Sequence, residues 1–202
     1  MSARRVVLAS GNPGKLRQFS ELLAHTDFAL LRQSEFGIEP PPETGHSFLE
    51  NSLIKARNAA RLTGLPAIAD DSGIEVDALG GRPGLYSARY AGENASDAEN
   101  LQKMLAELSG VPAPRRTARY RSVIVFVRAA DDGAPVVGEG VWEGAIADAP
   151  RGSGGFGYDP IFLPRESPGT AAELSTERRN ELSHRGQAAR AFLAQLNVRA
   201  RS

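Results

Sequence analysis

Four acidic side chains lie within eight residues of this chain, at Asp70, Asp71, Glu75 and Asp77. Residues 65–69 before them are apolar, and residues 74–78 alternate in polarity with the period of a strand. The pattern predicts that Asp70 and Asp71 lie on a tight turn at the edge of a sheet. Adjacent carboxylates repel each other, so a bound cation such as Mg²⁺ or Mn²⁺ is one interpretation. The alternative is a solvated Asp-Ser-Gly turn.

Basic side chains stand at two predicted helix starts, where they oppose the helix dipole. The loop 10–14 joins an apolar strand to a helix beginning near Lys15, and such a helix start presents backbone N–H groups to an anion. His184 and Arg185 open the last helix behind the N-cap Ser183. A bound phosphate would offset the unfavourable charge. The alternatives are an ordinary strand–helix turn with a solvated lysine and, at His184, a solvated cap residue.

Lys55 lies on a predicted helix that begins behind the N-cap Ser47 and ends near Thr63. At helical spacing it shares one face with Phe48, Ser52, Ala59 and Leu62. Its amine either snorkels to solvent or points towards an anion.

A second glycine-rich stretch covers residues 152–160 and carries Phe156. Its glycines permit close approach of the backbone to a ligand, and Phe156 can stack on a flat ring. The alternative is a surface loop closed by its own aromatic side chain. Taken with the acidic stretch and the basic groups, this loop indicates a site for a nucleoside polyphosphate.

The elements that position these residues alternate between strands and helices, which indicates an α/β fold. Strands are predicted at 6–9, 28–31, 119–127, 136–146 and 161–163, with a turn at 131–133 joining the third and fourth into a hairpin. Helices are predicted behind the capping residues Ser47, Ser96 and Ser183. An antiparallel pair added to a βα-type first half predicts a mixed sheet.

Composition excludes several function classes. The chain has 202 residues, with 24 basic and 24 acidic side chains, so no net charge attracts nucleic acid or an anionic membrane. It contains no cysteine, which excludes disulfides and thiolate chemistry and suits the cytoplasm. No run of residues is apolar over the length of a membrane span. A Gly-x-Ser-x-Gly elbow, a zinc-ligand spacing of histidines and a dinucleotide-binding Gly-x-Gly-x-x-Gly are also lacking.

Five motifs in order make the chain similar to the inosine/xanthosine triphosphate pyrophosphatases, which hydrolyse non-standard purine nucleotides. They are SGNPGKLRQ, ETGHSFLENSLIKA, ADDSGIEVDALGGRPGLYSARY, GSGGFGYDPIF and NELSHRGQA, from Ser10 to Ala188. The resemblance implies hydrolysis of inosine, deoxyinosine and xanthosine triphosphates to monophosphate and pyrophosphate with Mg²⁺, or with Mn²⁺ in its place. It also implies an elongated mixed sheet in a single domain over residues 1–202, with two lobes around a nucleotide-binding cleft, and a cytoplasmic homodimer.

The resemblance also assigns roles by position. Asp71 is expected to be the catalytic base and, with Glu43, a metal ligand. Asp70 is expected to tune Asp71 as a like-charged neighbour. Substrate contacts are expected from Ser10, Gly11, Asn12, Pro13, Gly14, Lys15, Lys55, Ser72, Phe156, Gly157, Tyr158, Asp159, Arg179, His184 and Arg185. Arg179 stands where the family usually has lysine, so the geometry of that contact is expected to differ.

Two alternatives to this function follow from the same residues. One is a pyrophosphatase of related fold that acts on modified pyrimidine nucleotides. The other is a nucleotide-binding module without turnover, although pure binding does not require the metal-type carboxylates.

Overall fold

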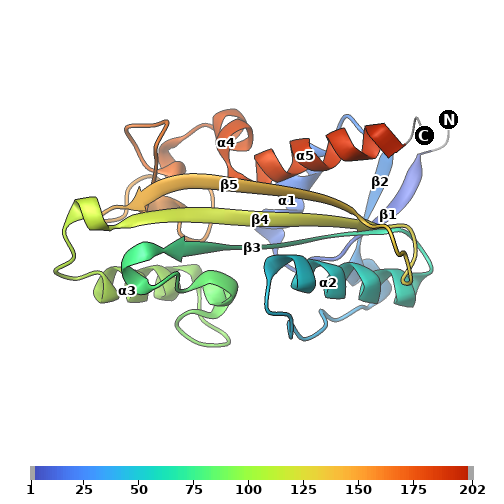
Figure 1. Cartoon of the computed structure of the whole chain (residues 1–202), viewed down its shortest axis with the longest axis horizontal. Helices are drawn as coiled ribbons and strands as arrows, with labels where there is room; N and C mark the ends of the chain where they lie inside the picture. The colour runs from blue at the N-terminus through green and yellow to red at the C-terminus, as the bar shows by residue number, and fades with distance from the viewer. Residues whose placement is uncertain (1–2, 200–202) are drawn as a thin grey trace. The chain divides into compact units, whose positions relative to one another are not determined.

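Alternating apolar residues build six strands into one mixed sheet in the computed structural model, which describes residues 3–199 (Figure 1). The strands are β1 (Arg4–Leu8), β2 (Phe28–Arg32), β3 (Ala67–Val76), β4 (Thr117–Val127), β5 (Val136–Ile146) and β6 (Phe162–Pro164). Their order across the sheet is β2-β1-β3-β4-β5-β6. β1 is parallel to β2 and β3, whereas β5 is antiparallel to β6. The predicted α/β fold with a mixed sheet is therefore confirmed.

Five α-helices accompany the strands in the described part of the chain. They are α1 (Pro13–Leu22), α2 (Phe48–Thr63), α3 (Asp97–Glu107), α4 (Thr176–Leu182) and α5 (His184–Arg199). Ser47 caps α2 as predicted, by accepting the Glu50 N–H. The Glu50 carboxylate accepts the N–H of His46, the residue before the cap, at 2.7 Å. Within residues 3–199, no helix has the length and hydropathy needed to cross a membrane.

The chain divides into two compact units. The first unit comprises the described residues up to Asp71, with 122–140 and those from 185 onward; the second comprises 72–121 and 141–184. In the first unit, α2 lies on one face of the strands, and α1 and α5 lie on the other (Figure 1). The core under α1 and α5 contains the buried side chains of Val6, Leu8, Phe19, Leu23, Phe28, Ile68, Ile124, Phe126, Val136, Ala188, Ala189 and Phe192.

The second unit has its own core, in which aromatic side chains are prominent. α3 is the helix predicted behind Ser96. Its residues Leu101 and Met104 pack in this core, together with Leu108, the residue just after its end. Strands and loops contribute Ile74, Val76, Leu79, Tyr90, Ala118, Tyr120, Trp142, Ile146, Tyr158, Ile161, Phe162 and Ala171.

The acidic stretch does not form the predicted turn, because residues 67–76 form one continuous strand, β3. Gly73 therefore has a role other than turning the chain. A Cβ at Gly73 would collide with the carbonyl oxygen of Gly84 and would lie 2.6 Å from Ser87 Oγ. The Ser87 hydroxyl accepts the Ile74 N–H at 2.9 Å and donates to that same carbonyl at 2.6 Å. In this Asp-Ser-Gly sequence, the missing side chain of Gly73 lets Gly84 and Ser87 pack closely against β3.

We expect Gly138→Ala to destabilise the first unit. A Cβ on Gly138 of β5 would lie 2.5 Å from the backbone nitrogen of Phe192 in α5, and backbone atoms cannot rotate away. Overpacking of this kind typically costs about 1–3 kcal/mol. The free energy of unfolding, measured by urea titration, should fall by that amount. The matched control is Gly133→Ala in the loop before β5, where a Cβ meets nothing within 4 Å. Equal stability of the two variants would contradict the packing argument.

Candidate active site

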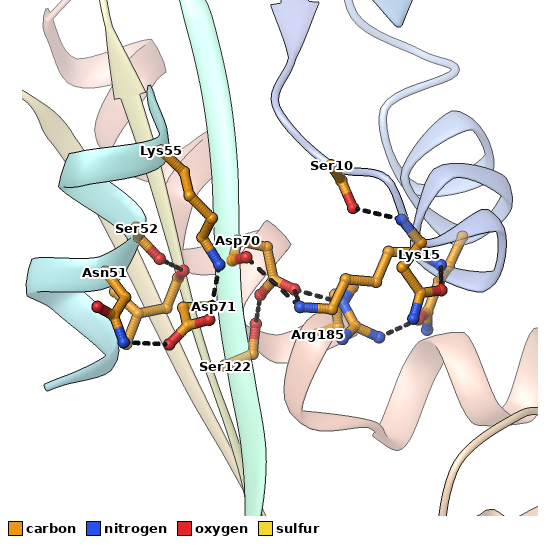
Figure 2. A network of polar contacts seen from close by, with 12 residues as sticks. Ser10, Lys15, Asn51, Ser52, Lys55, Asp70, Asp71, Ser122 and Arg185 are labelled. Atoms are coloured by element: carbon orange, nitrogen blue, oxygen red, sulfur yellow. Dashed lines mark hydrogen bonds and ion pairs between the residues drawn. The ribbon is translucent and has the colours of Figure 1, made fainter. Parts of the chain in front are cut away.

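Asp70 and Asp71 lie on opposite faces of β3, because successive side chains of a strand alternate. Figure 2 shows Asp71 directed towards α2 and Asp70 directed towards Lys15 and Arg185. Both carboxylates are buried, with relative exposures of 2% and 6%. Two charges in the interior of a strand require partners on both faces of the sheet.

Asp70 is neutralised by cations from two helices. Lys15 Nζ of α1 lies 2.8 Å from Asp70 Oδ2, and Arg185 Nε of α5 donates to the same oxygen at 3.2 Å. The Ser122 hydroxyl of β4 donates to the other carboxylate oxygen. Burial alone would raise the pKa of Asp70, but the charges of Lys15 and Arg185 outweigh it and hold the pKa far below its usual range. Asp70 is therefore a permanent anion.

Asp71 is bound from the other face by α2. Lys55 Nζ lies 2.6 Å from Asp71 Oδ1, and Asn51 Nδ2 donates to Oδ2 at 3.3 Å. Burial raises the pKa of Asp71 above its usual value, while Lys55 opposes that rise. The carboxylate of Glu43 adds to the rise. The tuning of Asp71 by Asp70 stays a prediction. Of the two aspartates, Asp71 is the one suited to accept a proton.

Lys55 joins Asp71 to Glu43. Its amine is 3.1 Å from Glu43 Oε1, so two carboxylate oxygens converge on one nitrogen. Burial would lower the pKa of Lys55, but these two carboxylates outweigh it and raise the pKa. Of the two alternatives for Lys55, the structure shows the one directed at anions, here two carboxylates of the protein. Its contact with substrate phosphates stays a prediction. Leu62, on the same helix face near the end of α2, is 51% exposed.

The loop between β1 and α1 is held by its own polar side chains. Asn12 caps α1 by accepting the Lys15 N–H at 3.1 Å, and its own N–H donates to Ser10 Oγ at 3.2 Å. Gly11, Asn12 and Pro13 are exposed. Lys15 at this helix start opposes the dipole, and the ion pair with Asp70 offsets that cost in the structure. The loop and the Lys15 amine thus lie together, as predicted.

The second glycine-rich loop belongs to the second unit, where two carboxylates hold its backbone. Asp159 accepts the Phe156 N–H at 3.1 Å, and Asp97 at the start of α3 accepts the Gly157 N–H at 2.7 Å. A Cβ at Gly155, which has φ +75°, would lie 2.8 Å from the Asp159 carboxylate carbon. This position therefore requires glycine. The Phe156 side chain is half-buried.

Other predicted substrate contacts of the second unit are largely buried. The Tyr158 hydroxyl donates to the carbonyl of Ser87 at 2.8 Å, so its ring is part of the core. His184 stacks on Tyr120 with ring centroids 4.5 Å apart and an interplanar angle of 6°. Arg179 is half-buried, and its guanidinium contacts the carbonyl of Leu174 at 3.5 Å. Ser72 is half-buried on β3.

A family model described as the Ham1 family matches residues 6–195. The chain belongs to the Ham1 family.

Curated and solved members of the Ham1 family align with nearly all of this chain. A protein of Methylococcus capsulatus named dITP/XTP pyrophosphatase is 56% identical over 195 residues, which cover 96% of this chain and 97% of that protein. A HAM1 protein from Coxiella burnetii has a TM-score of 0.88 at 47% identity, covering 96% of this chain and 98% of that one. A nucleoside-triphosphatase / dITP/XTP pyrophosphatase from Mycobacterium abscessus has a TM-score of 0.75 at 46% identity, with coverages of 94% and 98%.

The predicted resemblance is thus confirmed, but four side chains that contact the predicted site residues were not assigned from the sequence. The missed side chains all make hydrogen bonds. They are Asn51, which donates to Asp71; Ser122, which donates to Asp70; Gln18, which accepts from Arg185; and Asp97, which accepts the Gly157 N–H of the glycine loop. A signal existed for two of them. Asn51 lies four residues before Lys55 on the same helix face. Ser122 is the polar residue just before the apolar run 123–127.

Replacing Asp70 should destabilise the fold strongly. Asp70→Asn leaves Lys15 and Arg185 buried without their anion, which typically costs about 3–5 kcal/mol. Urea unfolding followed by circular dichroism measures the loss. The control is Glu181→Gln, which removes the short but exposed ion pair with Arg178 (2.6 Å), and exposed pairs contribute about 1 kcal/mol or less. A loss below 1 kcal/mol for Asp70→Asn would show that the buried pairs do not stabilise this unit.

Proposed function

We propose that this chain hydrolyses non-standard purine nucleoside triphosphates, namely inosine, deoxyinosine and xanthosine triphosphates, to the monophosphate and pyrophosphate. The observation that carries the proposal is the convergence of Glu43 and Asp71 on one buried cation position, Lys55 Nζ. The names of the aligned Ham1 relatives, dITP/XTP pyrophosphatase, support the substrate class. Removal of such nucleotides from the pool would be a cytoplasmic activity.

Glu43 and Asp71 fit a divalent metal that is completed by the substrate. Mg²⁺ in nucleotide enzymes is commonly held by one or two carboxylates together with substrate phosphates. We therefore propose Mg²⁺, with Mn²⁺ able to replace it, held by Glu43 and Asp71. Such an ion neutralises phosphate charge and lowers the pKa of bound water.

The chain's own residues supply the remaining chemistry of the proposed reaction. Asp71, whose pKa is raised by burial, accepts a proton from the attacking water. Water adds to the α-phosphorus, and the bond from that phosphorus to the bridging oxygen breaks to release pyrophosphate. Lys15, Lys55 and the loop 10–14 bind the phosphates with positive charge and backbone N–H groups. Because these groups are already ordered around β3, little reorganisation accompanies the reaction.

Base recognition is assigned to the second glycine loop and to the start of α5. Phe156 stacks on the purine, with Gly157, Tyr158 and Asp159 forming the wall beside it, and Ser72 and Arg179 add further contacts. His184 and Arg185 donate to the purine oxo groups. Adenine carries an amino group in place of the 6-oxo group, so it would leave these donors without acceptors. The ordering of the loop by Asp97 and Asp159 supports this role, since a stacking platform must be rigid.

We also propose that the protein is a homodimer, as the family resemblance implies. Sedimentation equilibrium should give twice the mass of 21.5 kDa.

The products of one assay test the reaction. Incubation with inosine, xanthosine, guanosine or adenosine triphosphate and Mg²⁺ should release pyrophosphate, fastest with the first two, and EDTA should abolish the release. Pyrophosphate and orthophosphate are measured separately. Stepwise orthophosphate, or preference for a modified pyrimidine triphosphate in the same panel, would overturn the proposal. Tight binding without turnover would favour the binding module.

Asp71→Asn tests the catalytic base. This variant keeps the size of the side chain but cannot accept the proton, so kcat should fall about 10²–10⁴-fold. Inosine triphosphate should still bind, as measured by calorimetry. The control is Asp77→Asn, which changes another carboxylate of the acidic stretch that pairs with Arg119 and is exposed. Wild-type turnover in Asp71→Asn would remove Asp71 from the role of base.

A further inference from the structure

Asn51 of α2 is a buried amide that uses both of its ends. Its relative exposure is 1%. Its Oδ1 accepts the Gly45 N–H at 2.8 Å. Its Nδ2 donates to Asp71 Oδ2 at 3.3 Å (Figure 2). The side chain therefore connects the loop before α2 to the carboxylate on β3.

The orientation of this amide follows from its partners. The backbone N–H of Gly45 is only a donor, so the oxygen of Asn51 must face it. The NH₂ group is then directed at Asp71, where an ionised carboxylate oxygen is the matching acceptor. Asn51 cannot flip without placing two donors together at Gly45 and two acceptors together at Asp71.

Gly45 of this loop packs directly against the side chain of Asn51. A Cβ on Gly45 would lie 2.7 Å from Asn51 Oδ1 and 2.7 Å from Glu50 Cβ, so a side chain there would push the loop away from α2. Glu43 stands two residues before Gly45 on the same loop, and its carboxylate contacts Lys55. Lys55 in turn contacts Asp71.

These contacts close a ring. It runs from Asp71 through Asn51 to Gly45, along the backbone to Glu43, and back through Lys55 to Asp71. The amine of Lys55 is the part of the ring that a metal and a phosphate would displace, since both carboxylates converge on it. Asn51 is the part that remains and still ties the loop of Glu43 to Asp71.

We propose that Asn51 is a positioning residue that fixes the separation between Glu43 and Asp71 and thereby assembles the two-carboxylate metal site. The proposal rests on the proposed function for the identity of the site. It assigns Asn51 no contact with the substrate.

Two variants weaken the same contact from opposite sides. Asn51→Ala removes both hydrogen bonds, and Gly45→Ala introduces the Cβ that collides with the amide oxygen. The loop stays attached in both, because the His46 N–H still donates to Glu50 at 2.7 Å. The matched control is Ser52→Ala, the next residue of α2, which is 0% exposed and donates to the Val123 carbonyl at 2.7 Å without contacting either carboxylate.

Metal binding provides the first measurement. Mn²⁺ is titrated by the loss of its free-ion paramagnetic resonance signal, in the presence of the α,β-methylene analogue of inosine triphosphate. We expect the Kd for Mn²⁺ to rise at least fivefold in Asn51→Ala and Gly45→Ala, and less than twofold in Ser52→Ala. The Mg²⁺ concentration for half-maximal turnover should rise in parallel, with the KM for nucleotide at saturating Mg²⁺ changed less than threefold. The double variant should lose no more Mn²⁺ affinity than the stronger single one.

Amide hydrogen exchange at position 45 provides the second measurement and needs neither metal nor turnover. Exchange of this amide should accelerate at least tenfold in Asn51→Ala and stay within twofold of wild type in Ser52→Ala. Wild-type Mn²⁺ affinity and exchange in Asn51→Ala would overturn the proposal, as would an equal loss of affinity in Ser52→Ala. Failure of the wild-type protein to release pyrophosphate would instead reject the proposed function, while the exchange experiment would still report on the link between Asn51 and the loop.

Discussion

Two adjacent negative charges inside one strand are the constraint on which this structure depends. The period of two along β3 sends Asp70 to the face covered by α1 and α5 and Asp71 to the face covered by α2. Buried carboxylates are tolerated only with cations and hydrogen bonds around them. Each face therefore carries its own cations, Lys15 and Arg185 for Asp70 and Lys55 for Asp71. Three helices of the first unit are tied to the strand by charge as well as by packing.

Asp70 and Asp71 have different surroundings and therefore suit different roles in such a site. Asp70 is held ionised by two cations and orders Lys15, so under the proposed function it would position an amine that binds phosphate. Asp71 has a raised pKa, one strong cation partner and a second carboxylate nearby, which suits proton transfer and metal binding. A site assembled in this way before substrate arrives stabilises developing charge without large rearrangement. The ion pairs seen here are thus the resting arrangement of groups that would bind phosphate and metal.

In the second unit, carboxylates likewise hold a polar part of the chain in place, here the glycine-rich loop of residues 152–160. Backbone N–H groups of Phe156 and Gly157 are held by two carboxylates, and glycine at 155 allows one of them to approach closely. The rings of Tyr120, Trp142, Phe162 and His184 form an aromatic cluster in the same unit, in which His184 and Trp142 stack on Tyr120 and Phe162 meets the rings at an angle. A rigid loop can discriminate between flat rings that a flexible one would accept alike.

The amino-acid sequence by itself determined the fold class and the family. Helix caps such as Ser47 and Ser96, and the strand runs, depend on local chemistry that can be read directly. Five motifs in order identified the family, because each motif combines residues that seldom occur together by chance. The sequence also placed Lys55 on a helix face with apolar neighbours, and left open whether its amine points to solvent or towards an anion.

Only the tertiary structure decided which charges meet. Asp70, Asp71, Ser72 and Gly73 have the composition of a turn, yet they form a strand, because cations from distant segments and close packing at Gly73 outweigh local preference. The partners of Asp70 lie 55 and 115 residues away in sequence, and no local pattern encodes such a distance. For the same reason the helical spacing of Asn51 and Lys55 is only a weak signal, since the role of Asn51 is revealed when the loop and the strand that it joins are brought together.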